Sequence, residues 1–138
     1  MSSLNIFGIA GSGMNAENLR LNLVSSNVAN ANAVSSSEGD VYKSRQPVFA
    51  AQLKSVLDKR QPGSEVRVLG VIESDAPPIM QYEPNHPMAD ANGFIYKPNV
   101  NTIEEMANMM SASRSYQNNV EVLDTAKQLI LQTLKLGS

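Results

Sequence analysis

The stretch "TIEEMANMMSASRSYQNNVEVLDTAKQLILQTLKL", residues 102–136, decides the fold that we expect for this chain. Its seam residues alternate at intervals of three and four, which is the period of a helix that packs along one line. At about 1.5 Å per residue this helix is roughly 50 Å long. A capping box formed by Thr102 and Glu105 is expected at its start. The seam positions are Met106, Met109, Ser113, Tyr116, Val120, Leu123, Lys127, Ile130 and Leu134.

The N-terminal stretch shows the same period and predicts a second helix from about Leu4 to about Ala31. Two such seams are most simply buried against each other, so we expect the two ends of the chain to form an antiparallel or splayed hairpin. The residues that we expect to meet within one subunit are Phe7, Met14, Leu21 and Val28 on the first helix, and Met106, Tyr116, Val120, Leu123 and Ile130 on the second.

The middle of the chain is strand-like instead. "VYKSRQPVF" (41–49), "EVRVLGVIES" (65–74) and "GFIYK" (93–97) are rich in β-branched and aromatic residues, and Val66, Val68 and Ile72 are predicted to share one face. "AAQLKSVLDKR" (50–60) suits a strand or a short helix. Four prolines between residues 77 and 87 predict an extended, semi-rigid strap.

The fold class that follows is mainly α with a small β insert. The N- and C-terminal helices are expected to pack as a coiled-coil-like hairpin around a central β-rich segment. Three regions result from this interpretation: an N-terminal helix over 1–33, the β-rich insert with its strap over 34–100, and a C-terminal helix over 101–138.

Each predicted helix also carries a second apolar stripe, which either the middle segment or neighbouring subunits must cover. Residues 1–37 hold two charged side chains, Glu17 and Arg20, whereas a solvated surface normally has about a quarter or more. This scarcity favours neighbouring subunits, and short amides would then bond between chains without burying a charge. The residues that we expect to face neighbours are Ile9, Leu19, Leu23, Asn27, Asn30, Asn32, Val122 and Leu129.

Composition and motifs argue against several classes of function. The net charge of −2 gives no basic surface for nucleic acid, and the absence of cysteine excludes thiol chemistry and thiolate metal sites. The chain shows no apolar run long enough for membrane insertion, and its start lacks the basic region of a cleaved signal peptide. His86, the one histidine, stands in a proline-flanked turn. We therefore expect no catalytic, cofactor-binding or metal-binding residues.

Two motifs resemble a known family. "SSNVANANAV" (25–34), at the end of the first predicted helix, is similar to the asparagine-rich motif of the axial proteins of the bacterial flagellum. "YEPNHPMADANGFIYKPNV", continuing through the C-terminal helix to residue 137, resembles the signature of the basal-body rod proteins of the proximal rod. A serine-rich stretch, residues 34–40, stands where many axial proteins have a Thr-Pro-Gly-Tyr-like turn.

The resemblance implies a structural subunit with no enzymatic activity and no cofactor. Such a subunit leaves the cell through the flagellar type III export apparatus without a cleaved signal peptide. It then assembles with other rod proteins and copies of itself into the periplasmic shaft that transmits torque from motor to hook, with the terminal helices forming the inner tube. The alternative is a soluble helical adaptor or secretion chaperone that binds its partner through the same apolar seams.

Overall fold

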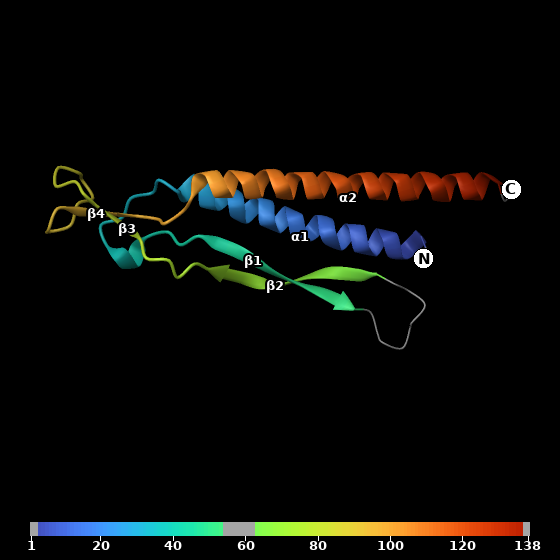
Figure 1. The fold of residues 1–138 in the computed structure, drawn as a ribbon, viewed down its shortest axis with the longest axis horizontal. Coiled ribbons are helices and arrows are strands. Elements are labelled where there is room, and N and C mark those ends of the chain that lie inside the picture. Colours follow the sequence, from blue (N-terminus) through green and yellow to red (C-terminus); the bar gives the residue numbers. More distant parts are fainter. Residues whose placement is uncertain (1–2, 54–62, 137–138) are drawn as a thin grey trace.

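A computed structural model describes residues 3–53 and 63–136 (Figure 1). Two long helices and two small antiparallel sheets confirm the prediction of a mainly helical chain with a β insert. The elements in chain order are α1 (Ser3–Asn30), a 3₁₀ turn (Glu38–Asp40), β1 (Arg45–Leu53), β2 (Ser64–Glu73), β3 (Ile79–Tyr82), β4 (Phe94–Lys97) and α2 (Thr102–Leu136).

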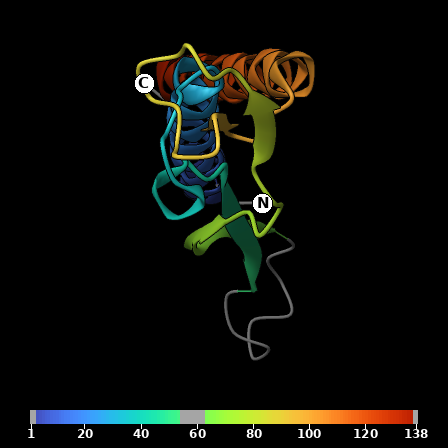
Figure 2. The same ribbon diagram turned by 90° about the vertical axis from the view of Figure 1, so that its left-hand side faces the viewer.

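Helix α1 is the middle of three layers. It runs antiparallel to α2 on one side and carries the β1–β2 hairpin on the other, as both ribbon views show (Figures 1 and 2). The two chain termini lie at one end of the helix pair, and the small β3–β4 sheet lies beyond the opposite end. The β1–β2 hairpin covers one face of α1, and covered faces carry few charged side chains. This packing within the chain helps to explain why the N-terminal region has so little charge.

The most deeply buried residues of the two helices are mostly small. On α1 they are Ala10, Ala16, Val24 and Asn27, which are 2%, 4%, 5% and 0% exposed. On α2 they are Glu105, Ala112 and Ala126, which are 6%, 0% and 5% exposed and recur at multiples of seven. This spacing keeps one line of α2 facing α1, and small side chains on that line let the helices approach closely.

The larger residues of the predicted seam lie beside this line rather than on it. On α1 all four of them are half-buried, and on α2 Met106 is 53% exposed while the others are half-buried. The predicted seam was thus displaced by about one residue from the line of deepest burial, because sequence periodicity weights large apolar residues over small and polar ones.

The start of α2 differs from the predicted capping box. The Asn101 side-chain oxygen accepts hydrogen bonds from the backbone N–H groups of Ile103 (3.1 Å) and Glu104 (3.3 Å), so Asn101 is the capping residue. Glu105, which the capping box would turn back along its own helix, is instead buried against α1.

A bulge in the β1–β2 hairpin changes the predicted faces of β2. Val68 lies opposite Phe49 whereas Gly70 lies opposite Val48, so Leu69 is an extra residue on β2. The insertion puts Ile72, opposite Gln46, on the other face from Val68. The prediction that Val66, Val68 and Ile72 share one face was therefore wrong, since one extra residue reverses the alternation.

The proline-rich strap is extended as predicted in its first half only, and part of that half pairs. Residues 84–92 instead form turns, such as the one closed by the hydrogen bond from the His86 N–H to the Glu83 carbonyl (3.0 Å). Residues 79–82 form β3, which lies antiparallel to β4 with Ile79 opposite Lys97 and Tyr82 opposite Phe94. The ambiguous stretch 50–60 begins as strand, because β1 continues to Leu53, and the rest of it lies outside the described residues.

Two glycines of α1 provide a test of the close helix approach. An alanine at Gly11 would meet nothing within 4 Å, so Gly11→Ala should raise the free energy of unfolding by about 0.8 kcal/mol through helix propensity. At Gly13 the added Cβ would lie 2.9 Å from the Asn119 side-chain nitrogen, so Gly13→Ala should gain less or lose stability. Thermal unfolding followed by circular dichroism gives both values, and an equal gain at both sites would contradict the packing.

Candidate assembly interface

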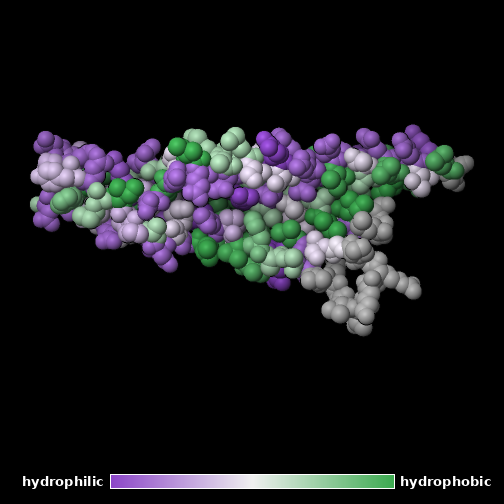
Figure 3. Space-filling model, in the orientation of Figure 1, coloured by the Kyte–Doolittle hydropathy of each residue, from purple (hydrophilic) through white to green (hydrophobic). Residues whose placement is uncertain are grey.

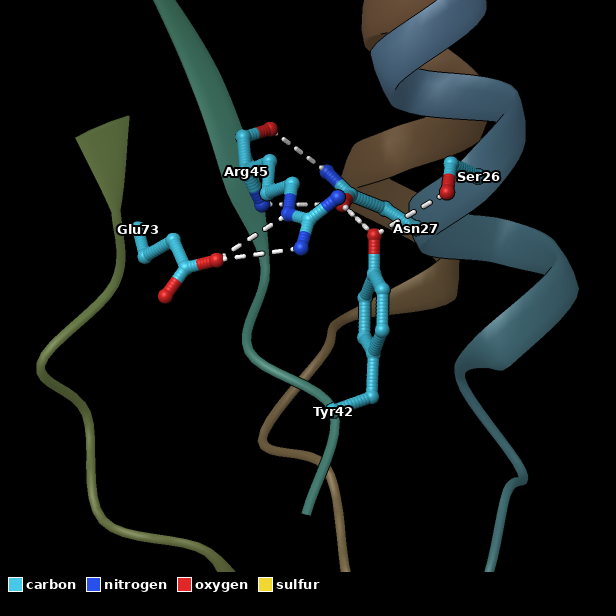
Figure 4. A network of polar contacts seen from close by, with 5 residues as sticks. All are labelled: Ser26, Asn27, Tyr42, Arg45 and Glu73. Atoms are coloured by element: carbon cyan, nitrogen blue, oxygen red, sulfur yellow. Dashed lines mark hydrogen bonds and ion pairs between the residues drawn. The ribbon is translucent and has the colours of Figure 1, made fainter. Parts of the chain in front are cut away.

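A completely buried amide joins three segments of the chain (Figure 4). The Asn27 side-chain nitrogen donates to the backbone oxygen of Arg45 (2.9 Å) and to the Glu105 carboxylate (3.0 Å). The Asn27 side-chain oxygen accepts from the Arg45 backbone N–H (2.9 Å) and from the Tyr42 hydroxyl (2.8 Å). Two donors and two acceptors are the full capacity of an amide, so Asn27 fixes the relative positions of α1, β1 and α2.

The surroundings of this amide strengthen the attachment of β1. Asn27 bonds both backbone groups of Arg45, as a neighbouring strand would. The Arg45 guanidinium in turn forms an ion pair with Glu73 of β2 at 3.1 Å and lies 5.9 Å from the centre of the Tyr42 ring. The hairpin is thus held to the helix at the end where β1 begins and β2 finishes.

The three asparagines that we expected at intersubunit contacts occupy different environments. Asn27 is 0% exposed, and its four hydrogen bonds all stay within the chain, which corrects its assignment to another subunit. Asn30 is half-buried and donates to the Ser26 carbonyl in its own helix (2.8 Å). Asn32, just after α1, is exposed. Sequence alone separates none of them, because the alternation of amides with small apolar residues is the same around each.

Part of the second stripe of α1 faces the chain's own hairpin. A Cβ atom built on Gly63 would lie 2.6 Å from Ile9, and the Ser12 hydroxyl accepts a hydrogen bond from the Val66 backbone N–H (3.0 Å). Leu19 and Leu23 are half-buried. The hairpin therefore covers some of the surface that we expected to meet neighbours, and this follows from a strand placement that helix periodicity does not encode.

The outer surface of α2 is different, since large apolar side chains stand exposed along it. Val122 is 46% and Leu129 58% exposed, and exposure increases toward the end of the helix, reaching 90% at Leu136. Figure 3 shows hydrophobic residues toward this end of the molecule and over the hairpin. The exposed large apolar residues of α2 are Ile103, Met106, Met110, Val122, Leu129, Leu131, Leu134 and Leu136.

The strands of the β1–β2 hairpin carry a second exposed apolar surface. Five of its large apolar side chains are more than a third exposed: Phe49, Val66, Leu69, Val71 and Ile72. A two-stranded ribbon is marginal alone, so its packing on α1 is what keeps these residues in place. Exposed apolar patches typically mark surfaces that bind other proteins.

The turn before β4 is organised by a carboxylate. The Asp90 side chain accepts from the backbone N–H groups of Phe94 (2.9 Å) and Asn92 (2.8 Å) and from the Tyr96 hydroxyl (3.2 Å). The hydrogen bond from Phe94 is the main cause that holds the pKa of Asp90 below its ordinary value. The hydrogen bond from the Tyr96 hydroxyl to Asp90 is the main cause that raises the pKa of Tyr96, because it holds the tyrosine proton.

The described residues contain neither a cluster of metal-binding side chains nor a helix suited to span a membrane. No group of three or more His, Cys, Asp or Glu residues there is placed to hold a metal ion. None of the helices described is both long and apolar enough to cross a membrane. The prominent surfaces of the described chain are therefore the two apolar ones.

Comparison with known proteins places both ends of the chain in one kind of protein. The family described as "Flagella basal body rod protein" matches residues 7–35, and "Flagellar basal body rod FlgEFG protein C-terminal" matches residues 91–136. The chain is 50% identical over 137 residues to the flagellar basal-body rod protein FlgC of Salmonella typhimurium, with 99% of both chains covered. The chain is 37% identical over 129 residues to FlgC of Agrobacterium fabrum, and this match covers 93% of this chain and 90% of the relative.

The buried amide gives a stability test. In Asn27→Ala, the Glu105 carboxylate and the Arg45 backbone groups lose a partner while staying enclosed, so the free energy of unfolding should fall by about 3 kcal/mol. Asn30→Ala is the matched control, because its amide makes one bond within its own helix, and it should change stability by about 0.5 kcal/mol or less. Urea unfolding measures both, and similar losses at the two sites would contradict the role of Asn27.

The Asp90 turn predicts a defined dependence on pH. Because the folded-state pKa of Asp90 lies below its ordinary value of 3.8, its contribution is present above that value and is lost as pH falls through the folded pKa. For Tyr96 the pKa is raised above 10.0, so its contribution is present below pH 10.0 and is lost as pH rises through the folded value. Asp90→Asn should remove the acid-side dependence, as tyrosine fluorescence of the variant and the unaltered chain across pH would show.

Proposed function

This chain belongs to the FlgC family of flagellar basal-body rod proteins, and on that premise we propose that it is a subunit of the proximal rod that assembles with other rod proteins and with copies of itself. The observation that carries the proposal is the exposed apolar surface of α2, from Val122 to Leu136. A lone soluble chain rarely leaves so many large apolar side chains of one helix in water, whereas neighbours in a tube would cover them.

The order of the layers supports different roles for the two helices and for the insert. Helices α1 and α2, within residues 1–33 and 101–138, form the inner tube as a coiled-coil pair, for which the seven-residue spacing of the buried residues of α2 is the support. The insert, residues 34–100, lies outside the tube on the far side of α1. Since α1 is covered on two sides by its own chain, α2 supplies most of the helical contact with neighbours.

A shaft that carries torque needs contacts that repeat without closing. When one surface of a subunit binds a different surface of the next, the result is a ring or an open helical assembly. Each exposed leucine covered on assembly would contribute roughly 1–2 kcal/mol, from about 25 cal/mol per Å² of apolar area. Torque is then shared among many modest contacts between subunits, and no catalytic step is required.

The proposed export route also depends on how readily the subunit unfolds. Passage through the flagellar type III apparatus, without a cleaved signal peptide, requires a chain that unfolds readily and regains its helices at the growing shaft in the periplasm. Helices depend on tertiary packing for most of their stability, which suits this route. The alternative, a soluble helical adaptor or secretion chaperone, is not favoured, because relatives that match along the whole chain are named as rod proteins.

A charge on the outer surface of α2 should stop assembly and leave the subunit intact. We expect Leu129→Glu to abolish swimming on soft agar in a strain that lacks its own copy of this rod protein, because Leu129 is 58% exposed and would lose its contact with a neighbour. The purified variant should keep the circular dichroism spectrum of the unaltered chain.

Gln128→Glu is the matched control, since it adds the same charge one residue earlier at an exposed polar position. It should swim nearly normally. Normal swimming of Leu129→Glu, with the variant present in purified basal bodies, would contradict the proposed contact.

A further inference from the structure

The two long helices pair in a register that leaves one end of α2 uncovered. Asn27 of α1 bonds Glu105 of α2, and Gly13, fourteen residues back along α1, lies against Asn119, fourteen residues forward along α2. Continuing this register puts Ser3, the first described residue of α1, level with Leu129. The last turns of α2 therefore extend past α1, as Figure 1 shows, and Leu131, Leu134 and Leu136 are 49%, 65% and 90% exposed.

Apolar packing alone would allow a different register. The residues of α2 that face α1 recur every seven positions, at Ala112, Asn119 and Ala126. Moving α1 forward by seven residues would therefore place Gly13 opposite the small residue Ala126 instead of Asn119. That shift, about 10 Å along the helix, would bring Ser3 level with Leu136. It would cover residues 130–136 in place of residues 102–108 of α2. The first stretch holds more large apolar side chains than the second, so the hydrophobic effect favours the shifted register.

The polar residues on the seam oppose this shift. In the shifted register Asn27 would lie opposite Ala112, and the Glu105 carboxylate, 6% exposed, would lose the Asn27 amide. Arg20 donates to the Asn108 side-chain oxygen at 3.2 Å and lies 3.7 Å from Glu17, and the first of these contacts would also break. A buried carboxylate without a partner is costly, and single polar layers are known to select register in helix pairs.

We propose that the Asn27–Glu105 and Arg20–Asn108 pairs are register-setting contacts, which hold α2 forward of α1 so that its last turns stay uncovered in the single subunit. The two registers have the same overlap of the helices, but the polar contacts hold α1 against the less apolar stretch of α2. The leucines that remain exposed are then available to a neighbouring subunit, and this last step rests on the proposed function.

The register can be read with pairs of introduced thiols, because the chain has no cysteine of its own. Gly13→Cys with Asn119→Cys reports the observed register, since these residues are in contact. Gly13→Cys with Ala126→Cys reports the shifted register, and in the observed one its thiols are about 10 Å apart along the seam, too far for a disulfide. Oxidation of the full chain at low concentration, followed by mass spectrometry, gives the yield of each intramolecular disulfide.

With the seam unaltered, we expect the first pair to form at least about tenfold more disulfide than the second, which corresponds to about 1.4 kcal/mol. In Arg20→Leu with Glu105→Leu, the yield of the second pair should rise about tenfold. Glu104→Leu is the matched control, because Glu104 is an exposed glutamate next to Glu105, and it should leave the ratio unchanged. A folded leucine variant that still forms the first pair alone would overturn the proposal.

A second variant guards against a failure to fold. Glu105→Ala with Ala112→Glu moves the carboxylate seven residues along α2, so Asn27 would find its partner in the shifted register and the second pair should dominate. Loss of helix by circular dichroism in both variants would also overturn the proposal, since the polar pairs would then be needed for pairing itself. These thiol yields are independent of the swimming test of Leu129→Glu, so the register inference and the rod assignment can fail separately.

Discussion

The buried Asn27 amide is the contact on which the arrangement of this chain depends. It is the place where α1, the start of β1 and the first turn of α2 meet, and all four of its hydrogen-bonding positions are filled within the chain. A leucine there could supply apolar contact, but it would leave the Arg45 backbone and the Glu105 carboxylate without partners. The amide thus links segments that lie 18 and 78 residues away in the sequence.

The central position of α1 constrains its composition in turn. A helix with α2 on one side and a hairpin on the other has little room for large side chains on either contact line. Its deepest positions are accordingly alanine, valine and asparagine, while Gly13 lies against α2 and Ser12 bonds β2. The scarcity of charge in residues 1–37, which suggested covering by other subunits, is explained in part by this covering within the chain.

The sequence predicts the long elements well because their signals are regular. Both helices were predicted within about one residue of their observed ends, and the strands of the hairpin and β4 within a few residues. What could not be predicted depends on single contacts between distant segments. The bulge at Leu69 reverses the face of Ile72, Asn101 competes with Thr102 as the helix cap, and β3 pairs despite its flanking prolines. The distinct role of Asn27 among three similar asparagines depends on partners that periodicity does not reveal.

The two helices are therefore unequal, and the inequality suits an open assembly. The faces of α1 are largely satisfied by its own chain, whereas α2 keeps apolar residues such as Leu129 in water. Two copies that paired through the exposed residues of α2 alone would close as a symmetric dimer. In the proposed rod, the exposed residues of α2 instead bind a different surface of the next subunit, such as the apolar strands of the hairpin or the flank of the helix pair. Contacts of that unlike kind can repeat along an axis, and this is the geometric requirement of a shaft.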